Sequence, residues 1–163
     1  MSKHSRSLPN TISETRQGNG GLGLDVKNHI LFAMCAKPGV CVVLDADKGT
    51  ILATLPIGNG TDGGGFNPNT MEAFSSQGDG TLTIIKEKSP TSFEVEQTVQ
   101  TKSRAKTCAL DTKKDQIILI TTEPSTNAPP QTASSGTNQP GGERRRAGGG
   151  GGPAMLDILV VGR

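Results

Sequence analysis

Apolar and polar positions follow the same pattern three times along the chain. Each copy places an apolar residue directly before Asp25, Asn67 or Asp111. A pair of apolar residues follows six and seven positions later: Leu31–Phe32, Ala73–Phe74 and Ile117–Ile118. The copies lie 42 and 44 residues apart, and short apolar runs bounded by turn residues fill each interval. This regular spacing predicts a repeated, strand-rich unit.

The first interval predicts four short strands joined by tight turns. The expected strands are GLGLDV (21–26), NHILFAMCA (28–36), VCVVLDAD (40–47) and GTILATLPIG (49–58). Pro38-Gly39 and Asp47-Lys48-Gly49 supply turns, because Gly tolerates the positive φ that hairpins require. A four-stranded sheet of this size cannot bury both of its faces alone. A period in the forties with such content is typical of β-propeller blades, which cover their faces by stacking.

The second interval repeats the order, and the third breaks it. The second should form strands at 63–67, 71–76, 81–88 and 92–101, with Phe93, Val95 and Gln97 alternating onto one face of the last strand. The third offers AKTCALD (105–111), DQIILITT (115–122) and MLDILVVGR (155–163). A fourth strand for this unit is missing.

We therefore predict an all-β fold, a partial β-propeller of about two and a half to three four-stranded antiparallel blades. The blades should cover about 21–58, 59–101 and 102–163. Residues 1–20 are polar and aperiodic, which predicts a flexible arm. Residues 123–153 are rich in Pro, Gly, Ser and Thr and offer almost nothing to bury, so they predict a disordered insertion.

Composition narrows the classes of function. The 163 residues include four Phe and neither Trp nor Tyr, so the core must be largely aliphatic. The net charge of +2 is too small to indicate a nucleic acid or an acidic membrane surface as a partner. No apolar run reaches the eighteen or so residues of a membrane span, and the N-terminus lacks the apolar region of a secretory signal. The chain as written is expected to stay in the cytoplasm.

The sequence offers little material for catalysis, metal binding or a cofactor. Cys35 and Cys41 flank a hairpin turn. Two reduced cysteines that pack as small apolar residues are favoured here, and a disulfide between them is the alternative. No Cys or His pair has the close spacing of structural zinc sites. With only His4 and His29, a Ser-His or Cys-His arrangement is not favoured. GNGGLG (18–23) precedes a strand instead of following one, so it fails the context of a dinucleotide fingerprint. We expect no catalytic residues, no metal and no cofactor.

The framework around these strands resembles a bacterial YVTN-family β-propeller repeat. The similarity lies in FAMC (32–35), VCVVLDADKGTILATLPIG (40–58) and NGTDGGGFNPNT (59–70), with FSSQ (74–77) and ILIT (118–121) at the YVTN positions. No copy keeps the tetrapeptide itself. The resemblance covers about 20–122 and 155–163 and is closest to the C-terminal blades of such proteins. It implies a propeller that is usually seven-bladed and generally exported, of which this chain would be a fragment.

Counting back five positions from each repeated Asp or Asn gives candidate ligand-binding positions at the channel mouth. The equivalent residues are Gly20, Asp62 and Lys106, with Arg104 close by. Asp62 and Lys106 should come from adjacent blades and could face one another. They would form either a polar ligand contact or a simple ion pair between blades, and the ion pair is favoured.

Three functions remain open. The leading hypothesis is a non-catalytic scaffold that binds a protein or ligand, with other blades or a second copy as partners. The first alternative is the remnant of a propeller enzyme of the lactonase or cofactor-bearing redox type. The other is single-stranded nucleic-acid binding through Arg144–Arg146, which the absence of nearby aromatic residues disfavours.

Overall fold

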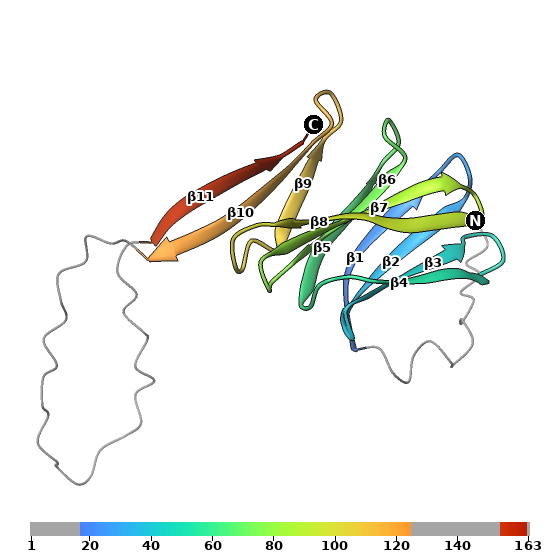
Figure 1. Cartoon of the computed structure of the whole chain (residues 1–163), viewed down its shortest axis with the longest axis horizontal. Coiled ribbons are helices and arrows are strands. Elements are labelled where there is room, and N and C mark those ends of the chain that lie inside the picture. The colour runs from blue at the N-terminus through green and yellow to red at the C-terminus, as the bar shows by residue number, and fades with distance from the viewer. Residues whose placement is uncertain (1–16, 125–153, 163) are drawn as a thin grey trace, which may run out of the picture.

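The computed structural model describes residues 17–124 and 154–162, and these residues form three antiparallel sheets (Figure 1). Most of the expected arm, His4, Arg144–Arg146 and nearly all of the expected insertion lie outside the described residues. All regular elements of the described part are strands. None of its segments is a helix long and apolar enough to cross a membrane.

The first two sheets each contain four consecutive strands. The first sheet comprises β1 (Gln17–Asp25), β2 (Ile30–Lys37), β3 (Val40–Asp45) and β4 (Ile51–Pro56). The second sheet comprises β5 (Thr61–Asn67), β6 (Glu72–Gln77), β7 (Thr81–Ser89) and β8 (Ser92–Gln100). β1 begins at Gln17, so the first strand starts inside the segment expected to be an arm. Each strand pairs with the next through a tight turn, which gives two meanders of the kind that the turn residues predicted.

The third sheet has three strands in the order β11-β10-β9. They are β9 (Thr107–Asp111), β10 (Gln116–Pro124) and β11 (Ala154–Val161). β10 continues to Pro124, past the expected start of the insertion. β11 pairs along its whole length with β10, from Val161 opposite Ile117 to Ala154 opposite Pro124. The described residues thus provide no fourth strand for this sheet.

The sheets stack face to face, and each contact between them is a hydrophobic layer. Between the first and second sheets, Phe32 stacks on Phe66 at a ring distance of 5.5 Å and meets the edge of Phe93 at 5.8 Å. Buried residues of both sheets complete this layer: Ile30, Met34, Cys41, Val43, Ala73 and Ile85. Between the second and third sheets the layer contains Phe74, Leu82, Ile84, Ala105, Ile117 and Leu119. The second sheet is therefore the only one of the three with both faces covered by another sheet.

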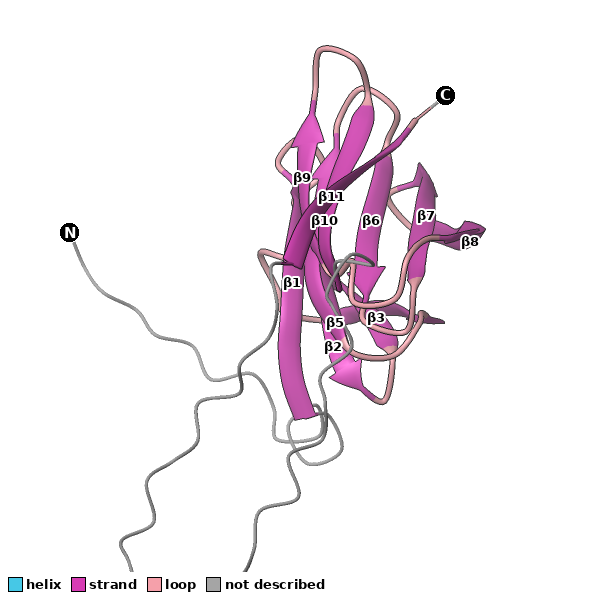
Figure 2. Ribbon diagram, turned by 90° about the vertical axis from the view of Figure 1, so that its left-hand side faces the viewer, coloured by secondary structure: helices cyan, strands magenta, loops and turns pink. Residues whose placement is uncertain are grey.

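Glycines let the innermost strands approach one another closely. β1 packs beside β5, and β5 packs beside β9 (Figure 2). A Cβ on Gly21 would stand 2.7 Å from the backbone nitrogen of Gly64, and one on Gly23 would stand 2.6 Å from the carbonyl oxygen of Gly65. No side chain fits at either distance. The glycine-rich segment of β1 therefore serves backbone packing, which accounts for a pattern that only superficially resembles a nucleotide-binding loop.

The outer strand of the second sheet departs from simple alternation. Val95 packs toward the first sheet, whereas Val99 packs toward the third. In a regular strand, residues four positions apart would lie on the same face. The pairing of β7 with β8 shifts between Ile84 and Ile85, which indicates a β-bulge that reverses the direction of the side chains. The expectation that Gln97 shares a face with Val95 is therefore wrong. Gln97 lies opposite Ile84, on the side of the third sheet.

The repeated Asp and Asn residues initiate turns, as the sequence predicted. A side-chain oxygen of Asp25 accepts a hydrogen bond from the backbone nitrogen of Lys27 at 2.9 Å. Asn67 does the same for Asn69 at 3.0 Å, and Asp111 for Lys113 at 2.9 Å. Because each turn links an inner strand to the next strand, the same residue type recurs in all three sheets.

Candidate functional site

Asp62 and Lys106, predicted to face one another, do so across the boundary between the second and third sheets. The Lys106 Nζ lies 3.3 Å from Asp62 Oδ2, and about half of each side chain is exposed. Asp62 belongs to the beginning of β5, and Lys106 directly precedes β9, so the pair joins adjacent inner strands. An exposed pair of this kind contributes about 0–1 kcal/mol to stability. Its geometry is that of an ion pair between blades, and a ligand contact at this position stays a prediction.

The backbone that carries this pair is fixed by neighbouring residues. The Ser76 hydroxyl donates a hydrogen bond to the Lys106 carbonyl oxygen. Arg104 has a φ of 67°, and its backbone nitrogen donates to the Gly78 carbonyl oxygen at 3.0 Å. The third predicted residue therefore holds the loop in place through its main chain. Its side chain is exposed, and no ion pair within the described residues involves it.

Lys102, in the same loop, makes two ion pairs that the sequence did not single out. Its Nζ lies 2.7 Å from Glu123 Oε1 and also pairs with Asp157. These two carboxylates raise the pKa of Lys102 above its ordinary value, so the side chain stays charged. The contact ties the loop to both strands of the β10–β11 hairpin. Sequence reasoning missed it because Glu123 and Asp157 are separated by the long insertion.

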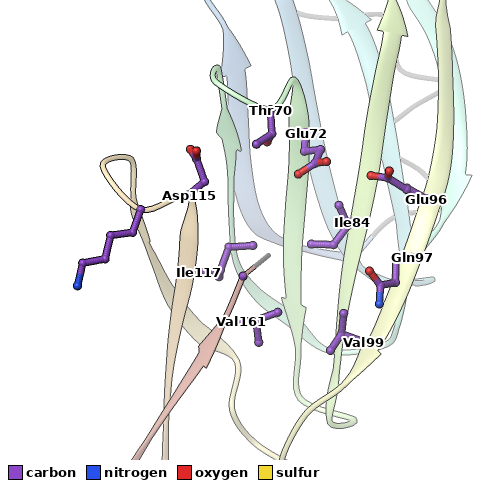
Figure 3. A pocket seen from close by; sticks show the side chains of 11 residues that line it. Thr70, Glu72, Ile84, Glu96, Gln97, Val99, Asp115, Ile117 and Val161 are labelled. Carbon is purple, nitrogen blue, oxygen red and sulfur yellow. The ribbon is translucent and has the colours of Figure 1, made fainter.

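A cleft of about 420 Å³ opens between the outer parts of the second and third sheets (Figure 3). Ile84 and Val99 of the second sheet point toward Ile117 and Val161 of the third, and these residues form its apolar floor. The rim is polar and carries Thr70, Glu72, Glu96, Gln97, Lys114 and Asp115. The missing fourth strand of the third unit was the signal in the sequence that could have indicated this opening.

Asp115 is the best-defined charge on that rim. Its Oδ1 accepts hydrogen bonds from Asn67 Nδ2 at 3.0 Å and Asn69 Nδ2 at 2.9 Å. These two donors lower the pKa of Asp115, which therefore stays ionised at neutral pH. Across the cleft, Glu72 pairs with Lys86 at 3.5 Å. The rim thus holds charges of both signs beside an apolar floor, with Asp115 fixed by two hydrogen bonds.

The cysteine thiols are buried at Cys35 and Cys41 and half-buried at Cys108. Burial raises the pKa of the Cys41 thiol to about 12, and burial also raises that of Cys108. Cys35 packs with Val42 and Leu44 on the opposite face of the first sheet from Cys41, so the two side chains point apart. The Nδ1 atom of His29 lies 2.7 Å from Oδ2 of Asp47. Within residues 17–124 and 154–162, no group of three or more His, Cys, Asp or Glu residues could hold a metal ion.

Comparison with solved structures supports the fold. One match is a β-propeller chain in the crystal structure of the mitotic checkpoint complex, with a TM-score of 0.55 and 14% identity over 64% of this chain. Another is a propeller in the hydrazine synthase of Kuenenia stuttgartiensis, with a TM-score of 0.52 and 10% identity over 61% of this chain. No family model matches the chain, and no curated protein does.

The three sheets are therefore blades of a partial β-propeller, as the sequence predicted. The chain spans about a third of the first matched structure and 29% of the second. At these identities the likeness concerns the fold alone.

Proposed function

We propose that the chain is a non-catalytic binding scaffold that contributes three blades to a larger β-propeller of the YVTN type. Its partner is another polypeptide that carries propeller blades, and the two associate by stacking sheet on sheet. Asp62, Arg104 and Lys106 then lie beside the channel of the assembled propeller, where they contact a polar ligand.

The observation that carries the proposal is the apolar character of both ends of the stack. On the first sheet, Leu22 is 62% exposed and Leu24 is 49% exposed, whereas Cys35, Val42 and Leu44 of the same face are buried. On the third sheet, Ile158 is 60% exposed and Val160 is 56% exposed, beside Ile120. Exposed apolar surface on opposite faces favours contact with further sheets of the same kind.

The two internal boundaries of the stack show what such a contact requires. Each buries aliphatic residues and Phe side chains between two sheets. The end faces present exposed aliphatic residues on strands of the same kind, although without Phe. The association is driven by the removal of apolar surface from water, which contributes about 25 cal/mol per Å².

Size-exclusion chromatography with light scattering and circular dichroism tests the proposal. The purified chain should show the circular dichroism spectrum of β-strands. Its mass should exceed the 16.9 kDa of one copy, because the exposed apolar end faces associate. Leu24→Asp and Ile158→Asp, each with its charge on one end face, should reduce the association. Ser92→Asp, an exposed change in β8, is the matched control and should leave it unchanged. A stable, strand-rich monomer would contradict the proposal.

A further inference from the structure

The third sheet ends at a strand that has pairing capacity on one side. β11 forms its hydrogen-bonded ladder with β10, and no other described strand pairs with it. In the first and second sheets the equivalent third strands, β3 and β7, each pair with a fourth strand. An exposed strand edge presents unpaired N–H and C=O groups, which are a template for another strand.

The cleft lies beside β8 and the C-terminal end of β11, next to the edge where that strand would pair. Between the first and second sheets, the two fourth strands β4 and β8 lie in contact. On its other side β8 has no such neighbour among the described strands, and the cleft lies beside Val99 and Gln97. The hollow beside β8 thus reaches the C-terminal end of β11 at Val161, where the edge of the described sheet is unpaired (Figure 3).

We propose that the edge of β11 binds a fourth β-strand from another chain, and that this strand fills the cleft against β8. The source of the strand rests on the proposed function, since a partner with propeller blades would supply it. The site itself rests on the three-stranded sheet and the cleft.

The lining of the cleft defines the chemistry of the incoming strand. Its inward side chains must be apolar, because they would cover Ile84, Val99 and Val161. Acidic side chains would be disfavoured, because the rim carries three carboxylates, Glu72, Glu96 and Asp115, against one lysine, Lys114. β4 has this character in the first sheet, because ILATLP carries no charge, whereas β8 carries Glu94 and Glu96. The site therefore prefers a strand of the β4 type.

Hydrogen exchange on the full chain tests the site with a synthetic peptide of residues 49–58 as the probe. The peptide should slow amide exchange in β11 and in the part of β8 around Val99. A peptide of residues 91–100 should bind more weakly because of its two glutamates. A version of the first peptide with Pro at Ala53 should not bind, since Pro removes a donor from the ladder and breaks the strand.

A pair of adjacent variants provides the matched test on the protein. Val99→Asp places a charge on the apolar floor and should weaken peptide binding about tenfold or more, through the lost burial of one aliphatic side chain. Thr98→Asp changes the next residue, which is exposed on the other face of β8, and should leave binding within about twofold.

Two results on the wild-type chain would overturn the inference, and neither depends on the variants. The first is unchanged exchange in β11 at saturating peptide. The second is slower exchange confined to β3, which would mean that the peptide replaces β4. Failure of the proposed function is a separate result, because the mass and the end-face variants are measured without peptide.

Discussion

At the scale of single residues, Glu87 is a carboxyl group buried in the second sheet. It is 3% exposed and lies between the first and second sheets. Asn28 Nδ2 donates to its Oε1 at 2.8 Å and to Asp25 Oδ2 at 2.7 Å, so one amide serves two carboxylates. Burial, with the nearby Asp25, raises the pKa of Glu87 above its ordinary value of 4.5. Folding therefore favours the protonated form of Glu87.

This environment predicts that Glu87 makes the protein less stable as pH rises. A carboxyl with a raised folded-state pKa contributes its stability fully below pH 4.5 and loses it as pH rises through the folded value. Glu87→Gln keeps the acceptor for Asn28 and removes the charge, so it should increase the free energy of unfolding at pH 7 and not at pH 4. Urea unfolding at both values measures this. Glu94→Gln, at an exposed carboxylate, is the control and should change the free energy of unfolding by no more than about 0.5 kcal/mol. Equal effects of the two variants would contradict the argument.

The positions of Asp62 and Lys106 were predictable because they follow from the repeat. Counting from Asn67 and Asp111 placed Asp62 and Lys106 on neighbouring strands, and the structure brings them to 3.3 Å. The role of Arg104 was not predictable. Its contribution comes from a backbone conformation with positive φ, which a sequence pattern does not report for a residue other than Gly.

At the scale of elements, the strands and turns were predictable and the bulge was not. Alternation and turn dipeptides give each strand of the first two sheets to within a few residues. The shift in pairing at Ile84 and Ile85 leaves no mark in the sequence of β8, because Val95 and Val99 look equivalent there. The bulge lets β8 place Val95 in the layer toward the first sheet and Val99 in the layer toward the third. The cleft depends on the same strand, and so its lining was not predictable either.

The Asx turns allow a prediction that separates two residues with the same local role. Asn67 is 4% exposed and also donates to Asp115, which links two sheets. Asp111 is less buried, and its carboxylate accepts a hydrogen bond from the backbone nitrogen of Lys113 within its own turn. Asn67→Ala should therefore lower the free energy of unfolding by about 1–3 kcal/mol, because it leaves buried groups unpaired. Asp111→Ala should lower it by about 1 kcal/mol or less. Equal losses in denaturant unfolding would show that the bond between sheets adds nothing.

At the scale of the whole molecule, stability should be distributed unevenly over the three sheets. The second sheet is covered by another sheet on both faces, and the first and third sheets on one face each. The third sheet also has three described strands instead of four. Strands with fewer buried contacts open more easily. The repeat alone could predict three stacked units, but not which would be the weakest, since that follows from the missing strand and the faces left open.

Native-state hydrogen exchange on dilute protein measures this distribution. Amides in β6 and β7 should exchange slowest and those in β9–β11 fastest, with β2 and β3 between them. Leu82→Ala removes a fully buried side chain from the middle sheet and should lower protection in all three sheets, by about 2–5 kcal/mol. Ile120→Ala, at a residue that is 42% exposed, should affect mainly β9–β11. If all sheets instead exchanged at one rate, they would open as a single unit, and the third sheet would need no additional strand to match the stability of the others.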